Sequence, residues 1–126
     1  MTSKFKIVLT LVSGIALGAA AVQGLHAQSK PKAYRIVESE VLDAAALAVY
    51  IPLNAAAEKA AGARTIAPPG KPVTFVGQAP TRVSIVEFES LEKYQAFRNS
   101  DAFKNITPQR DKALKILRSY VIEGAN

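Results

Sequence analysis

Two carboxylates lie two positions apart in the segment RVSIVEFESLEKYQAF, residues 82–97: Glu87 and Glu89. Side chains alternate along a strand, so Glu87 shares a face with Val83 and Ile85, and we expect it to be partly desolvated. A desolvated carboxylate has a raised pKa and can act as a base. The alternative is that Glu87 pairs with an arginine and orders the end of the strand. Glu89 follows the predicted strand, near a helix cap, and is expected to be solvated.

Arginine and tyrosine side chains complete the set of candidate ligand-binding residues. Arg110 falls near the N-terminus of the last predicted helix, where backbone amides and a guanidinium can together hold an anion such as a carboxylate. The alternative for Arg110 is a surface partner at i,i+4 spacing or an ion pair with Asp111 or Glu87. Arg82 and Tyr34 lie on strands that are expected to line a cavity. No residue is assigned a catalytic role.

The composition removes several classes of chemistry. The only histidine, His26, lies in an N-terminal segment that we expect to be removed, so we predict no histidine base, histidine-bound metal or Ser-His triad. The chain contains no cysteine, and it lacks the GxGxxG, P-loop and HExxH motifs. We therefore predict no cofactor and no metal. The net charge of +6 falls to +4 without Lys4 and Lys6, and the scattered basic residues indicate no nucleic-acid partner.

The first 27 residues have the pattern of a secretory signal peptide. Two lysines precede sixteen uncharged residues, 7–22, and small residues follow. Cleavage is expected after Ala27, with Gly24 as the alternative. An uncleaved membrane anchor is the other interpretation, but this run is shorter than the ~20 apolar residues that a spanning helix needs. We expect a bacterial protein that is exported, periplasmic or secreted, without stable membrane association after cleavage.

The mature chain begins with a polar stretch, QSKPKA, which we interpret as a flexible leader over residues 28–33. One domain follows over residues 34–124. Alternation and β-branched residues predict strands at 34–41, 81–88 and 118–124, and two short strands at 63–67 and 72–77 around the turn PPGKP.

Helix signals separate these strands. Asp43 is a good N-cap and Gly62 a good C-terminal residue for the first helix. Ser90 caps a second helix, and Thr107 followed by Pro108 predicts the start of a further helical piece that reaches residue 117. Buried helical stripes are predicted to contain Tyr50, Tyr94 and Phe97. The resulting βαββαβ order is the ferredoxin-like α+β plan with an antiparallel sheet.

The strands carry apolar residues on both faces, as in RIV, SIV and YVI. Helices cover only one face of such a sheet, so the other face needs a partner. A second copy of the chain is the simplest partner, and we expect a homodimer that encloses a barrel-like space between two sheets. We expect a ligand cavity in that space.

Three segments, YRIVESEV, VSIVEFESLEKYQAFRNSDAF and YVIEG, resemble the bacterial domain-of-unknown-function family 1330, over residues 34–124. The resemblance implies membership of the dimeric α/β-barrel superfamily, which includes cofactor-free monooxygenases, isomerase-like enzymes and stress proteins. It implies the fold and the dimer but no particular reaction. Many members lack an export signal, and the PPGKP insertion here is longer and richer in proline than the family pattern.

Two functions follow from these patterns. The first is a dimeric binding module of the periplasm that holds a small molecule in a mostly apolar cavity with a few polar anchors. The second is a cofactor-independent monooxygenase- or isomerase-like enzyme that uses Glu87 or a tyrosine. The missing histidine favours binding. An interaction role without a ligand is a third interpretation.

Overall fold

The computed structural model describes residues 30–125. The predicted signal peptide and its cleavage site lie outside this range. The elements are β1 (Ala33–Val41), α2 (Ala44–Ala60), β2 (Arg64–Gly70), β3 (Arg82–Phe88), α3 (Leu91–Asn99), α4 (Asp101–Ala113) and β4 (Leu114–Glu123). The strands form one sheet in the order β2-β3-β1-β4, and every neighbouring pair is antiparallel. The predicted ferredoxin-like α+β fold is therefore confirmed.

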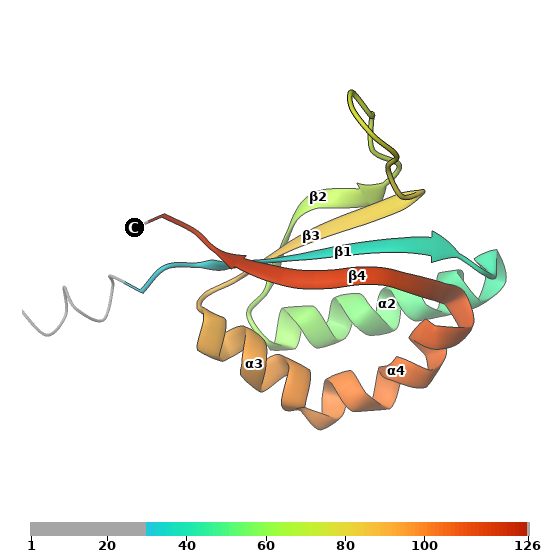
Figure 1. The fold of residues 1–126 in the computed structure, drawn as a ribbon. Coiled ribbons are helices and arrows are strands. Elements are labelled where there is room, and N and C mark those ends of the chain that lie inside the picture. The colour runs from blue at the N-terminus through green and yellow to red at the C-terminus, as the bar shows by residue number, and fades with distance from the viewer. Residues whose placement is uncertain (1–29, 126) are drawn as a thin grey trace, which may run out of the picture. The chain divides into compact units, whose positions relative to one another are not determined.

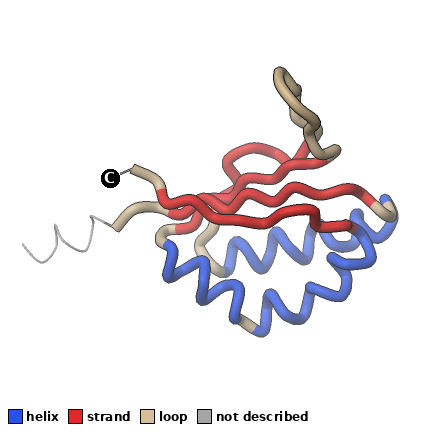
Figure 2. The backbone as a smooth tube through the Cα atoms, in the orientation of Figure 1, coloured by secondary structure: helices blue, strands red, loops and turns tan. Residues whose placement is uncertain are grey.

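The chain forms two layers, a sheet and a set of helices on one of its faces (Figures 1 and 2). No described helix covers the other face. Within the described range, no helix combines the length and apolar composition that crossing a bilayer requires.

Local capping signals set several of the helix ends. The Asp43 carboxylate accepts from the Ala46 N–H at 3.0 Å, and the Ser90 hydroxyl accepts from the Lys93 N–H at 3.2 Å. Each interaction satisfies an amide that has no partner within the first helical turn. Gly62 follows α2 with φ of 73°, a conformation that glycine adopts without a Cβ clash. The caps predicted at these positions are confirmed.

The predicted start of the last helix is wrong. The helix α4 begins at Asp101 because the Ser100 hydroxyl accepts from the Phe103 N–H at 3.2 Å. Thr107 lies inside this helix, where its hydroxyl donates to the Phe103 carbonyl at 2.9 Å. Pro108 is also internal, although it lacks the N–H that would bond the preceding turn. The helix ends at Ala113, four residues before its predicted end.

The region around PPGKP also differs from the prediction. One strand, β2, continues through Pro68 and Pro69 to Gly70, with register shifts against β3. Because β2 is an edge strand, these prolines need not donate to a neighbouring strand. The second predicted strand, 72–77, does not form. Its large apolar side chains are exposed in a loop that extends away from the sheet (Figure 1): Val73 81%, Phe75 92% and Val76 95% exposed.

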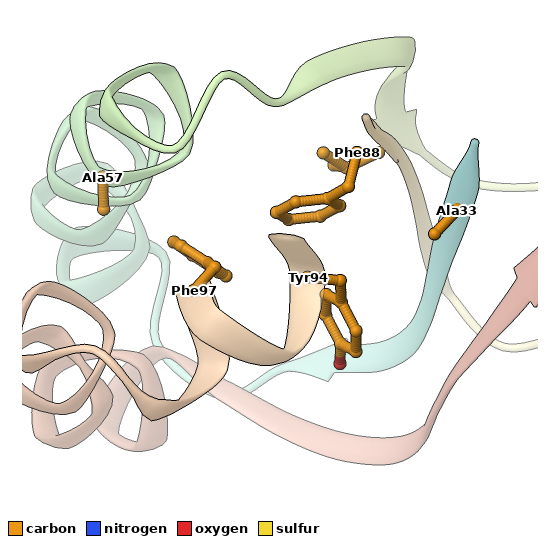
Figure 3. Close-up of a cluster of buried hydrophobic side chains, with 6 residues drawn as sticks. Ala33, Ala57, Phe88, Tyr94 and Phe97 are labelled. Carbon is orange, nitrogen blue, oxygen red and sulfur yellow. The ribbon is translucent and has the colours of Figure 1, made fainter. Parts of the chain in front are cut away.

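The core lies between the sheet and the helices. Phe88 at the end of β3 is fully buried, and its ring centroid lies 5.1 Å from that of Tyr94 and 5.3 Å from that of Phe97 (Figure 3). Aromatic pairs at these separations add favourable edge contacts to the burial of apolar area. The predicted buried stripe of α3 is confirmed by Tyr94 and Phe97.

Candidate functional site

A cavity of about 270 Å³ lies on the face of the sheet that carries the helices. All four strands and all three described helices contribute to its lining. Its apolar and aromatic lining includes Val86, Ile116, Tyr94 and Phe103. The sequence placed a ligand in a space between two sheets, which lies on the opposite side of the sheet from this cavity.

Arginine dominates the charge of the cavity lining. Its four basic residues are Arg35, Arg82, Arg98 and Arg110, whereas Glu58 is its one acidic residue. Residues 35, 37, 39 of β1 and 82, 84, 86 of β3 share the helix-facing side because side chains alternate along a strand and paired residues lie on the same face. Strand alternation thus brings Arg35 and Arg82 to the cavity from neighbouring strands.

Glu58 is the centre of a buried hydrogen-bond network. Arg35 Nη2 lies 2.5 Å from Glu58 Oε1, and Asn54 Nδ2 donates to the same oxygen at 2.9 Å. The Tyr50 hydroxyl donates to Asn54 Oδ1 at 3.1 Å. Residues 50, 54 and 58 follow one another at i,i+4 spacing and therefore lie along one face of α2. Because an ionised carboxylate only accepts, the network fixes the Asn54 amide with its nitrogen towards Glu58.

Tyr50 was predicted as a core residue, and it is both a core residue and part of the cavity lining. It is buried and packs against Ala113 and Leu114, but it also lines the cavity. Burial raises the pKa of its phenol above the ordinary value of 10.0, so Tyr50 keeps its proton near neutral pH. A protonated phenol suits hydrogen bonding better than proton abstraction. The sequence signal for this polar network was the i,i+4 spacing of the polar residues 50, 54 and 58 in an alanine-rich helix.

Arg82 lies in the cavity without a partner among the described residues. It is half-buried, and its side chain forms no hydrogen bond or ion pair with any residue between 30 and 125. Burial lowers the pKa of its guanidinium, and the negative charge of Glu58 acts in the opposite direction. Arginine stays charged at neutral pH in proteins, so Arg82 brings a positive charge that no nearby carboxylate pairs with. The sequence placed Arg82 at a cavity between two sheets, whereas Arg82 lines the cavity on the helix-facing side of the sheet.

Arg110 also lines the cavity, but not at a helix N-terminus. Since α4 begins at Asp101, Arg110 lies in its last turn, and the predicted help from N-terminal amides is wrong. Its Nε and Nη2 donate to Asp111 Oδ1 at 3.1 and 3.0 Å, which is the ion pair that the sequence left as the alternative. Its guanidinium also lies 5.7 Å from the centroid of the Phe103 ring.

Glu87 and Tyr34 lie on the other face of the sheet, away from the cavity. They are direct partners across β1 and β3. Glu87 pairs with Lys32 Nζ at 3.1 Å and with Arg64 Nη2 at 3.3 Å. Hydrogen bonds from Lys32 and then Arg64 lower the Glu87 pKa, against the opposing effect of burial. The hypothesis of a raised pKa is therefore wrong, and the interpretation that an arginine pairs with Glu87 at the strand end agrees with the structure.

The arrangement is suited to holding a negatively charged group. Arg82 and Arg110 meet in one cavity, and the residue best placed to abstract a proton there, Glu58, already shares a buried ion pair. Among residues 30–125, no three His, Cys, Asp or Glu side chains gather in a way that would hold a metal ion.

Comparisons with known proteins agree with the fold. The crystal structure of the RPA0582 protein of unknown function from Rhodopseudomonas palustris is similar with a TM-score of 0.65 at 12% identity, covering 86% of this chain and 93% of that one. The methylated RPA0582 protein gives a TM-score of 0.61 at 12% identity, with coverage of 86% and 91%. No curated protein matches the sequence. The domain of unknown function DUF1330 matches residues 32–125, and the chain therefore belongs to that family.

Proposed function

We propose that this protein binds a small molecule in the cavity between its sheet and its helices. The observation that carries the proposal is the cavity itself, which is hollow, about 270 Å³ in volume, and lined by apolar side chains with a few polar anchors. Ligand sites in proteins typically have this composition, and their volumes begin near ~300 Å³. The size indicates a compact ligand, on the scale of one or two fused rings.

Binding is favoured over catalysis by the protonation states in the cavity. A general base needs a free carboxylate, imidazole or phenolate near the substrate. Glu58 is held by Arg35 and Asn54, and burial keeps the Tyr50 phenol protonated. These groups can hold a ligand in one orientation without taking a proton from it.

Export and dimerisation are parts of the same proposal. The signal-peptide pattern of residues 1–27 supports a mature protein that works outside the cytoplasm. The sheet face without helices supports a homodimer, because apolar side chains lie along it: Ile36, Val83, Ile85, Tyr120 and Ile122. In such a dimer each chain keeps its own cavity on the outer side of its sheet.

A thermal-shift screen with a metabolite library tests the binding function. Ala55 is exposed on α2 and lines the cavity, so Ala55→Trp should fill the space with little effect on the fold. Ala45→Trp, on an exposed position of α2 outside the cavity, is the matched control. We expect some compounds to raise the melting temperature of the wild type and of Ala45→Trp but not of Ala55→Trp. Chromatography should recover these compounds unchanged.

Two results would count against this function. The first is a library in which no compound changes the melting temperature of the wild type. The second is a shift that Ala55→Trp retains in full, because the binding would then lie elsewhere on the protein.

A further inference from the structure

We propose that the ligand is an organic monocarboxylate with a flat apolar body, and that Arg82 binds its carboxylate. This inference rests on the proposed binding function and specifies the chemical class of its ligand. Two features of the cavity support it: the pairing of each charged side chain, and the apolar side chains around those charges.

Arg82 holds the one half-buried positive charge of the cavity that forms no ion pair among the described residues, although the Glu58 carboxylate is near enough to act on it. The Arg35 charge is paired with Glu58, and the Arg110 charge with Asp111. Arg98 lines the cavity as well, but it is exposed and donates to the Tyr94 hydroxyl. Of the four arginines, two are in ion pairs and one is in contact with solvent. The remaining positive charge is that of Arg82, and one negative charge on a ligand would balance it.

Burying a charged group without a partner is costly, and the structure keeps Arg82 partly desolvated. A carboxylate that enters the cavity would supply the missing acceptor, and the planar guanidinium can bind it through two parallel hydrogen bonds. Such charge-assisted bonds are stronger than those between neutral groups. Among the residues of the cavity, Arg82 is therefore the one that should contribute most to the binding free energy of a carboxylate ligand.

A second observation is that a buried donor on this side of the cavity lacks an acceptor. Arg35 is 7% exposed, and its Nε is buried without a hydrogen-bond partner in the described part of the chain. Buried donors in proteins are nearly always paired. The unpaired Arg35 Nε, together with the unpaired Ser39 hydroxyl opposite Arg82, favours a ligand that brings acceptor oxygens.

The rest of the lining defines the body of the ligand. Tyr94 and Phe103 contribute aromatic side chains, and Val86 and Ile116 contribute aliphatic ones. Such surfaces favour a flat apolar group, which buries its area without leaving polar atoms unpaired. A phosphate monoester would bring close to two negative charges to a site with one unpaired arginine, so the charge balance favours a carboxylate.

Three probes of nearly equal shape test the inference: naphthalene-2-carboxylate, naphthalene-2-carboxamide and naphthalen-2-yl phosphate. Their dissociation constants are measured by titration calorimetry with the purified protein. We expect the carboxylate to bind at least about tenfold more tightly than the carboxamide, as a hydrogen bond to a charged group predicts. Arg82→Gln should abolish that preference, and Arg82→Lys should keep part of it.

Lys104→Gln is the matched control, because it removes the same charge from an exposed position of α4 outside the cavity. It should leave the preference for the carboxylate unchanged. Should Arg82→Gln fail to fold, the three wild-type dissociation constants still decide the ligand class.

The inference is overturned if the carboxylate does not bind, if it binds no more tightly than the carboxamide, or if the phosphate binds most tightly. An equal loss in Arg82→Gln and Lys104→Gln also overturns it, because the effect would then be general electrostatics. If the carboxamide binds at least as tightly as the carboxylate and Ala55→Trp blocks that binding, the proposed function stands and only the carboxylate is refuted.

Discussion

Arg35 on β1 and Glu58 on α2 form an ion pair in which both side chains are about nine-tenths buried, at 9% and 8% exposed. The pair joins the sheet to α2, and both of its residues line the cavity. Replacing such a pair by apolar residues is often neutral, but removing one partner leaves a buried charge without compensation. Removing either residue should therefore lower the stability of the fold, because the other residue would keep a buried charge without a partner.

We predict that Glu58→Gln lowers the free energy of unfolding by roughly 3–5 kcal/mol. Urea unfolding followed by circular dichroism measures this loss. Asp111→Asn is the control, because it breaks the ion pair of Arg110 with an aspartate whose side chain is 59% exposed. Pairs of that kind are worth about 0–1 kcal/mol, and a loss in Asp111→Asn equal to that in Glu58→Gln would contradict the prediction.

Glu87 makes the stability depend on pH in a direction that its pKa shift determines. Lys32 and Arg64 lower its pKa in the folded state below the ordinary value of 4.5. Its stabilising contribution is therefore complete above that value and is lost as the pH falls through the lower, folded-state pKa. We predict that Glu87→Gln makes the melting temperature fall less steeply below about pH 4.5 than it does in the wild type.

The effect of Glu87→Gln at pH 7 should be small, at most about 1 kcal/mol, because solvent screens both partner side chains. Lys32 and Arg64 are 56% and 72% exposed. Melting temperatures of the wild type and Glu87→Gln between pH 3 and 7 test the prediction. Parallel profiles would show that Glu87 does not contribute to the acid sensitivity.

Short-range signals predicted the fold because they act within a few residues. Asp43, Ser90 and Gly62 each satisfy or relax a neighbouring part of the backbone, so their roles are visible in the sequence. The start of α4 shows the limit of this approach. The sequence predicted this start at Thr107, whereas the structure uses Ser100 as the N-cap and keeps Pro108 inside the helix.

The candidate site was harder to predict because it depends on which face of the sheet the helices cover. Alternation correctly separated Glu87 from Val86 and Phe88, but apolar residues on both faces left the choice between the faces undecided. The helix layer packs on Phe88, so Arg82 faces the cavity and Glu87 does not. The buried partners Arg35 and Glu58, 23 residues apart, carried no local signal of their pairing.

Export makes a prediction about the N-terminus. Residues 1–27 have the charged start, apolar run and small residues at which signal peptidases cleave. We expect the protein recovered from the periplasmic fraction or the medium of its bacterial host to begin at or near Gln28, as measured by N-terminal sequencing. Recovery of the chain only from membranes, with Met1 or Thr2 still present, would contradict the signal peptide and favour the uncleaved anchor.

Dimerisation through the sheet predicts how two lysine substitutions will differ. Ile122 on β4 pairs with Tyr34 on the face without helices and is 54% exposed in the single chain. Val49 on α2 is 53% exposed. Lysine is tolerated at either position in a monomer, because both side chains already reach water. In a dimer, however, Ile122→Lys would bury a charge in the interface, whereas Val49→Lys would leave its charge in solvent.

We therefore expect sedimentation equilibrium to give twice the mass of one chain for the wild type and for Val49→Lys. Ile122→Lys should weaken the association by tenfold or more, which corresponds to a loss of ~1.4 kcal/mol, and should sediment as a monomer at low micromolar concentration. An interface of standard size would bury ~800 Å² on each chain. A wild-type protein that remains monomeric at those concentrations would contradict the dimer, and a dimer that survives Ile122→Lys would place the interface away from β4.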